Sequence, residues 1–106
     1  MKIKICGLFR DKDIEYANEA KPDFAGFVFA ASRRQVNGAH AARLRKNLLP
    51  GIVPVGVFVD AALQDIVSLY KDGVISIAQL HGNEDDCYIA ELKGLCGVPA
   101  RIQFSE

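Results

Sequence analysis

The sequence has no tryptophan, a single methionine and no excess of charge of either sign. Among its 106 residues, thirteen basic side chains balance thirteen acidic ones, so the formal net charge at pH 7 is zero. A chain without net charge has no overall field that would attract nucleic acid or an anionic membrane surface. A local cluster of basic side chains can still bind a small anion. The charge balance therefore limits the macromolecular partners but not the small-molecule substrates.

Cysteines are few and long apolar runs are missing. Cys6, Cys87 and Cys96 are an odd number without a CxxC pair, which argues against a disulfide framework and against a zinc ribbon. No apolar run approaches the ~20 residues that span a bilayer, and the first residues lack a signal-peptide pattern. We therefore expect a cytoplasmic protein with reduced thiols and no metal. The sequence also contains no P-loop and no GxGxxG motif.

Half of the residues are hydrophobic and a quarter are charged, as in soluble globular domains. The length suits one domain, which we assign to residues 1–106. Five short runs are rich in β-branched and aromatic residues and predict strands. They are Lys2 to Cys6, Phe24 to Phe29, Ile52 to Val59, Val74 to Leu80 and, more weakly, Val98 to Phe104.

Segments with helical period separate these runs. The clearest has Leu63, Ile66, Val67 and Tyr70 on one face. Asp60 is placed to cap its start, and Gly73 to end it in the left-handed conformation. The other predicted helices carry Ile14, Ala17 and Ala20 (about Asp11 to Ala20), then Ala41, Leu44 and Leu48 after Asn37, and finally Ile89 and Leu92 after Asn83.

Alternating strands and helices predict an α/β fold with parallel strands and right-handed crossovers. Two architectures fit this pattern. One is a five-stranded doubly wound sheet of the flavodoxin or receiver type, which is complete at about this length. The other is the first half of a (βα)8 barrel, which normally needs ~250 residues. The alternation of elements alone favours the first, because it needs no missing part.

In both architectures ligands bind at the carboxyl ends of the strands. A Cys6 thiolate there could abstract a proton from a substrate if positive charge lay nearby, although most free cysteines are small buried hydrophobes. Arg34, next to Arg33, offers a planar fork for a carboxylate or phosphate, or is a solvated loop charge. Gln79 and His81 end the fourth strand, where His81 lines a pocket or hydrogen-bonds within a turn. We interpret Cys87 and Cys96 as packing residues and His40 as structural or exposed.

Four segments, in this order, resemble the signature motifs of phosphoribosylanthranilate isomerases. Lys4-Ile5-Cys6-Gly7-Leu8 is similar to KICG(L/I), and Gly26-Phe27-Val28-Phe29-Ala30 with Ser32-Arg33-Arg34-Gln35-Val36 is similar to GFVF…S-x-R-x-(V/I). Val55-Gly56-Val57-Phe58-Val59-Asp60 resembles VGVFV(N/D), and Gln79-Leu80-His81-Gly82-Asn83-Glu84 resembles QLHG(D/N)E. The resemblance favours the half barrel, about four and a half βα units, over the doubly wound sheet.

The resemblance implies an Amadori rearrangement in tryptophan biosynthesis, without metal or organic cofactor. N-(5-phosphoribosyl)anthranilate becomes 1-(2-carboxyphenylamino)-1-deoxyribulose 5-phosphate. In this chain the resemblance implies that Cys6 is the general base and that Arg34 holds the anthranilate carboxylate. It also implies that Gln79 and His81 line the same pocket.

Members of the family are about twice as long, and their general acid is an aspartate on the sixth strand, which the resemblance does not locate in this chain. We therefore expect a truncated isomerase with low activity alone, and self-association or pairing with a missing C-terminal half. Two other functions stay open. A receiver-like phosphorelay module would need paired acidic residues where Cys6 and Gly7 stand. A non-catalytic interaction fragment would keep the family's sequence without its activity.

Overall fold

The computed structural model describes residues 3–30, 33–80, 86–96 and 101–104, over which five strands and four helices alternate. The strands are β1 (Lys4–Cys6), β2 (Phe24–Val28), β3 (Val53–Phe58), β4 (Ile77–Leu80) and β5 (Arg101–Phe104). The helices are α1 (Asp11–Ala20), α2 (Gly38–Asn47), α3 (Leu63–Lys71) and α4 (Asp86–Cys96). The alternation and the approximate position of every predicted element are confirmed.

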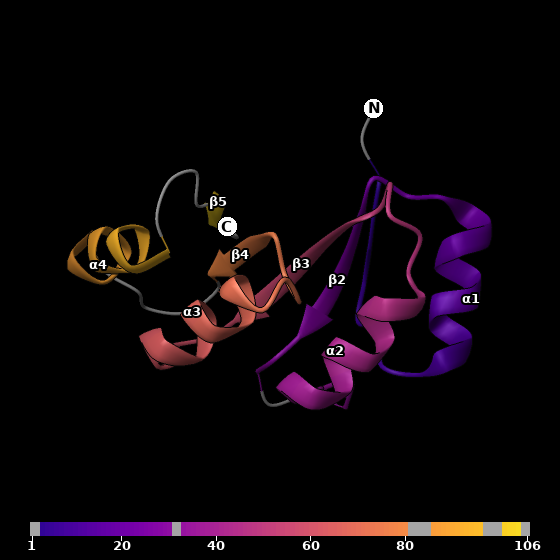
Figure 1. Ribbon diagram of the computed structural model, residues 1–106, viewed down its shortest axis with the longest axis horizontal. Helices are drawn as coiled ribbons and strands as arrows, with labels where there is room; N and C mark the ends of the chain where they lie inside the picture. Colours follow the sequence, from indigo (N-terminus) through magenta and orange to yellow (C-terminus); the bar gives the residue numbers. More distant parts are fainter. Residues whose placement is uncertain (1–2, 31–32, 81–85, 97–100, 105–106) are drawn as a thin grey trace.

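The order of the strands decides between the two predicted architectures. All neighbouring strands are parallel, and their order in the sheet is β1-β2-β3-β4-β5. A flavodoxin-like sheet would have the order 2-1-3-4-5 with helices on both faces, so the doubly wound alternative is wrong. Sequential right-handed crossovers place all helices on one face, as in a barrel. In Figure 1 the helices follow one another in an arc, from α1 through α2 and α3 to α4, along the outside of the strands.

Alternate residues of each strand form the core between the sheet and its helices. Register places Ala25, Phe27, Phe58, Ala78 and Leu80 on this face, and each is at most 3% exposed. The helices contribute Ile14, Ala41, Leu44, Ile66 and Leu92 to the same core. The strand residues that alternate with this core-facing set, Cys6 among them, point to the opposite, concave face of the sheet.

Helix ends follow local hydrogen bonding. The Asn37 side chain accepts a hydrogen bond from the His40 N–H at 2.7 Å and caps α2, the helix predicted to follow it. Gly73, with φ +75°, follows α3 in the left-handed conformation, which is also as predicted. The cap predicted at Asp60 is wrong, because α3 begins at Leu63 and its N-cap residue is Ala62. Asp60 itself has φ +49° and belongs to the turn before the helix.

Two further expectations need correction. The strand expected from Val74 begins only at Ile77, because the N–H groups of Val74 and Ile75 donate to the Leu69 carbonyl at the end of α3. Cys87 is exposed on α4 rather than packed. The side chain of Cys96, and Asn83 before the last predicted helix, lie outside the described part of the structure.

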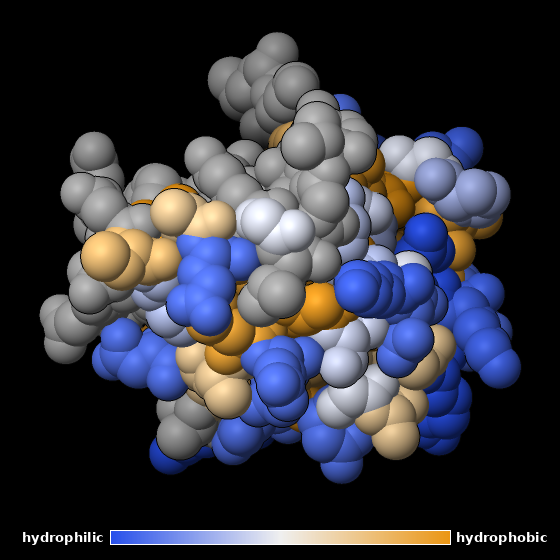
Figure 2. Space-filling view, turned by 60° about the vertical axis from the view of Figure 1, so that its left-hand side comes forward, coloured by the Kyte–Doolittle hydropathy of each residue, from blue (hydrophilic) through white to orange (hydrophobic). Residues whose placement is uncertain are grey.

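The molecular surface mixes apolar and charged side chains. Seen from the side that carries α3 and α4, apolar surface is visible between hydrophilic side chains (Figure 2). Within the described ranges, no helix is long and apolar enough to cross a membrane.

Candidate functional site

The carboxyl end of β1 brings together the residues that the sequence singled out first. Cys6 ends β1 and pairs in register with Gly26 of β2. The Gly7 and Leu8 N–H groups both donate to the Gly26 carbonyl, at 3.0 and 3.2 Å. These bonds turn the chain out of the strand directly after Cys6, and Gly7 makes the turn with φ +85°. The Cys6 thiol is thereby left exposed on the concave face.

Glycine is required at two contacts of this site. A β-carbon on Gly26 would lie 2.8 Å from Cys6 Sγ, so the absence of a side chain on β2 makes room for the thiol. A β-carbon on Gly7 would lie 2.8 Å from Cδ and 3.1 Å from Nη1 of Arg34. The Arg34 side chain therefore lies directly over Gly7. Cys6 and Arg34, 28 residues apart in sequence, flank one glycine.

Backbone contacts bind the loop that carries Arg34 to the end of β2. Val28 forms an isolated parallel bridge with Gln35, and the Val36 N–H donates to the Val28 carbonyl at 2.9 Å. The Gln35 side chain donates to the Phe29 carbonyl at 3.4 Å. These contacts return the chain to the end of β2, which places Arg34 over the end of β1. Arg33 and Arg34 are both exposed.

Lys4 is a site residue that the sequence analysis missed. Its Nζ donates to Oε1 of Gln79, although β2 and β3 lie between β1 and β4 in the sheet. In a flat sheet these strands would be about 14 Å apart with parallel side chains. The contact thus requires the sheet to curve so that side chains of its concave face converge, as in a barrel. The available signal was the period of two, which puts Lys4 on the face of Cys6.

The other candidate positions lie elsewhere in the fold or outside the described residues. His81 and Ser32 lie outside the described residues, so their placement is not part of the site as described. Asp60 follows β3, where it is exposed. His40 is partly buried in α2 and its N–H serves the helix cap. Within the described residues, no group of three or more His, Cys, Asp or Glu side chains is arranged to hold a metal ion.

The arrangement combines a nucleophilic or basic group with two fixed cations. Cys6 directly precedes Gly7, over which the Arg34 side chain lies, and Lys4 stands two residues before Cys6 on the same face of β1. Gln79 adds an amide whose oxygen already accepts from Lys4. A cysteine side chain can act as a nucleophile or base, and a planar guanidinium suits a carboxylate. The site can therefore bind an anion and act as a base close to it.

Comparison with known proteins identifies relatives along nearly the whole chain. The family model of N-(5'phosphoribosyl)anthranilate (PRA) isomerase matches residues 3–106. The N-(5'-phosphoribosyl)anthranilate isomerase of Endomicrobium trichonymphae is 50% identical over 92 residues, which are 87% of this chain and 46% of that relative. The enzyme of Acetivibrio thermocellus is 47% identical over 95 residues, covering 90% of this chain and 44% of that relative. The chain thus spans about half the length of these curated relatives.

Solved structures similar to this chain come from the same family. TrpF from Jonesia denitrificans matches with a TM-score of 0.87 and 30% identity, over 100% of this chain and 51% of that chain. Phosphoribosyl anthranilate isomerase from Thermus thermophilus gives a TM-score of 0.81 and 30% identity, over 98% of this chain and 50% of that chain. A third isomerase, in complex with reduced 1-(o-carboxyphenylamino)-1-deoxyribulose 5-phosphate, gives 0.81 and 29% over 89% and 49%. The five strands therefore form part of a (βα)8 barrel.

Proposed function

The chain belongs to the N-(5'-phosphoribosyl)anthranilate isomerase family, and on that basis we propose that it supplies the general base and the carboxylate-binding group of this isomerase. The reaction is the Amadori rearrangement of N-(5-phosphoribosyl)anthranilate in tryptophan biosynthesis. The observation that carries the proposal is the position of Cys6 and Arg34 on either side of Gly7 at the carboxyl end of β1. Catalytic residues of barrel enzymes stand at this end of the strands.

Cys6 has the role of the base in the second chemical step. In the first step the ribose ring oxygen gains a proton and its bond to C1 breaks, which leaves a Schiff base between C1 and the anthranilate nitrogen. The Cys6 thiolate then takes the proton from C2. The electron pair of that C–H bond forms the C1–C2 double bond, and the π pair of the C1–N double bond moves to the nitrogen. The enolamine gains a proton at C1 and loses the one on the C2 hydroxyl, which gives the ketone.

Arg34 binds the substrate carboxylate close to this base. Its guanidinium offers parallel N–H donors that match the two carboxylate oxygens. Gln79 and His81 line the pocket, and the contact from Lys4 holds the Gln79 amide in one orientation. We place the ring-opening general acid outside residues 1–106. The chain alone is then expected to turn over substrate poorly, because a positioned acid is typically worth ~10²–10⁴-fold in rate.

The sheet geometry supports a macromolecular partner as well. Within the described residues, β1 pairs only with β2 and β5 only with β4, so two strand edges and the concave face are available. Either a second copy or the remaining half of a barrel satisfies such edges. We also propose a cytoplasmic location, since Cys6 must stay reduced to act as a base and reducing compartments preserve thiols.

A binding experiment tests the role of Arg34. The chain is joined to the C-terminal part of its relative from Endomicrobium trichonymphae, so that the barrel is complete. Calorimetry then measures binding of the reduced product that the solved relative holds. Arg34→Met is expected to weaken binding by about 10- to 150-fold, as for hydrogen bonds to a charged group. Arg33→Met is the matched control. Equal losses in the two variants would contradict the assignment.

A further inference from the structure

A second hollow lies on the outer side of the sheet, away from Cys6. It is a groove of about 610 Å³ between α2 and α3, within the usual size range of small-molecule sites. Its walls come from one face of each helix, and its floor comes from the ends of β2 and β3. The groove shares none of its lining residues with the cluster of Cys6, Arg34, Gln79 and Lys4. It is therefore a separate site.

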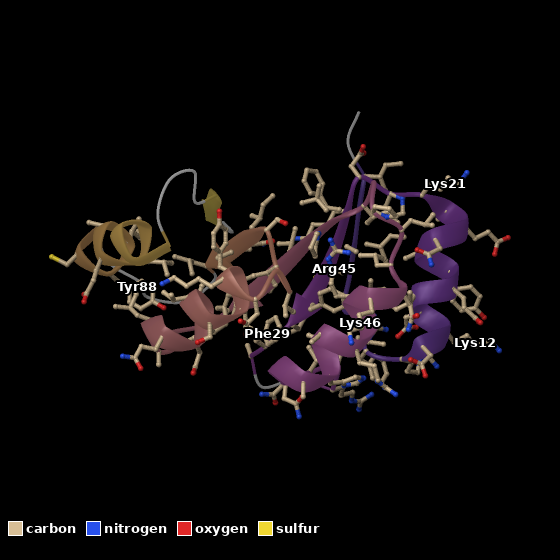
Figure 3. All side chains as sticks on the ribbon, in the orientation of Figure 1. Lys12, Lys21, Phe29, Arg45, Lys46 and Tyr88 are labelled. Carbon is tan, nitrogen blue, oxygen red and sulfur yellow. The ribbon has the colours of Figure 1, made fainter. Side chains whose placement is uncertain are left out.

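The floor of the groove is aromatic. Phe29, just after β2, and Phe58, the last residue of β3, stack with ring centroids 5.0 Å apart and planes 7° apart. Phe58 is 1% exposed, whereas Phe29 is only partly buried and lies in the gap between α2 and α3 (Figure 3). Phe29 thus presents an aromatic surface on which a flat molecule can stack.

Small residues keep the groove open. The face of α2 that turns toward α3 consists of Gly38, Ala39 and Ala42. A β-carbon on Gly38 would reach ordinary contact with a methyl group of Leu69 at 3.4 Å, so the two helices are close at this point. The side chains of Ala39 and Ala42 end at a methyl group, and the groove lies beside them. The space between the helices is consequently left to a ligand.

The charge along the groove has one sign. The charged side chains among the described residues that line it are Asp65 of α3 and Asp72 at its end. Both are exposed, and neither forms a salt bridge with another described residue. Asp65 and Asp72 are seven residues apart, about 10 Å along the helix axis, so a single cationic group meets only one of them. Asp72 also lines an adjoining hollow with Arg45 and Lys46, which leaves Asp65 as the carboxylate that favours a cation over an anion.

We propose that this groove binds a small organic cation with a flat apolar body, of the arylalkylamine class. The aromatic body stacks on Phe29 and fills the space beside Ala39 and Ala42. The ammonium group points along α3 toward Asp65. The shape of the groove and its apolar floor provide the contact area, while the Asp65 carboxylate selects the sign of the ligand's charge.

A set of three probes with the same ring system tests the proposal on the full chain. They are 2-naphthylmethylammonium, 2-naphthylmethanol and 2-naphthylacetate, titrated at pH 7 and low salt while amide signals are followed by NMR. The ammonium probe is expected to shift signals of α2 and α3 with a dissociation constant of about 0.1–1 mM. The alcohol should bind about two- to five-fold more weakly, and the carboxylate more weakly still.

Two variants separate the contributions of shape and charge. Ala39→Leu fills the groove and is expected to weaken both the ammonium and the alcohol probe. Asp65→Asn is expected to remove most of the preference for the ammonium probe and to leave the alcohol unchanged. Ala90→Leu and Glu15→Gln are the matched controls, because Ala90 and Glu15 are exposed on α4 and α1. These two should bind as the parent chain does.

Several results would overturn the proposal. Equal affinity for the three probes would show an unselective apolar surface. Shifts confined to the concave face would assign the probe to the site of Cys6. Groove signals that change with protein concentration in the absence of probe would show that a second copy occupies the groove. Loss of binding in the control variants to the same extent as in Asp65→Asn would remove the argument from charge.

Discussion

Asp13 is the residue whose protonation the structure links most directly to stability. Its carboxylate accepts hydrogen bonds from the Arg10 guanidinium and from the N–H groups of Phe9 and Arg10. The bond from the Arg10 side chain is the largest cause that lowers the pKa of Asp13 to about 2. The same carboxylate thereby satisfies donors at the start of α1 that would otherwise have no partner within the helix.

A pH titration of stability tests this contact. The pKa of Asp13 is lower in the folded than in the unfolded chain, so its contribution is complete above about pH 4 and is lost as pH falls toward about 2. Asp13→Asn should lower the free energy of unfolding by about 1 kcal/mol at pH 7. The difference between variant and parent should shrink between pH 4 and pH 2. Urea unfolding measures both, and a difference independent of pH would contradict the account.

At the scale of single residues, the sequence could select the candidate site residues that are marked by a motif and by the end of a strand. Cys6, Arg34 and Gln79 could be chosen because each follows or ends a predicted strand, and the structure places them on one side of the sheet. Lys4 was missed, because its partner Gln79 comes within reach only through the curvature of four strands. Curvature is a property of the whole sheet, and the sequence of a single strand carries no signal of it.

Among the helices, α2 offers the clearest test of local design. Asn37 caps it through the His40 N–H, and Arg45 and Lys46 in its last turn complement the negative end of the helix. Asn37→Ala should destabilise the chain by about 1 kcal/mol in urea unfolding, because a helix donor loses its acceptor. Gln64→Ala, at an exposed position of α3, is the control and should change stability by less than about 0.5 kcal/mol. Equal effects would refute the cap.

The helices could be predicted more precisely than the strands. The range Asp11 to Ala20 for α1 is confirmed, and the basic side chains of Lys12 and, just beyond the helix, Lys21 point away from the core (Figure 3). The start of β4 was set too early, because Val74 and Ile75 are as apolar as strand residues but complete the end of α3 instead. A run of apolar residues indicates that a segment is buried, but it does not distinguish a paired strand from a buried helix end.

The contact between α4 and the loop before α3 is another feature that local sequence patterns do not predict. The Tyr88 hydroxyl donates to the Ala61 carbonyl at 2.7 Å and joins α4 to the loop before α3, as the position of Tyr88 in Figure 3 illustrates. The two residues are far apart in sequence, and neither belongs to the apolar stripes that defined the predicted helices. Contacts of this kind depend on the packing of one βα unit against the next.

For the whole molecule, the alternation of elements could not decide between two folds. Both contain parallel strands and helices in the same order, and they differ in which strands are neighbours. The motifs of the isomerase family were the better guide, and the sequential strand order agrees with them. Strand order is fixed by long-range pairing, so local patterns carry little information about it.

The available strand edges lead to a prediction about assembly. β1 has one described neighbour, and Ile3 beside it is 57% exposed. An apolar edge strand favours pairing with another chain, and a charge at the edge opposes it. Multi-angle light scattering should therefore show a molar mass that rises with concentration, and Ile3→Lys should reduce the rise. Leu49→Lys, at an exposed apolar position away from the edge, is the control. A monomer at all concentrations would contradict the prediction.

The most direct test of the proposed function is the turnover of N-(5-phosphoribosyl)anthranilate by the barrel completed with the C-terminal part of the Endomicrobium trichonymphae relative. The loss of anthranilate-adduct fluorescence measures the rate. Cys6→Ser should lower kcat by about 10²–10⁴-fold with little change in KM, since the base acts in the chemical step. Cys87→Ser, which alters the exposed thiol of α4, should leave the rate unchanged. A Cys6→Ser variant that keeps more than half of the parent's turnover would contradict the account.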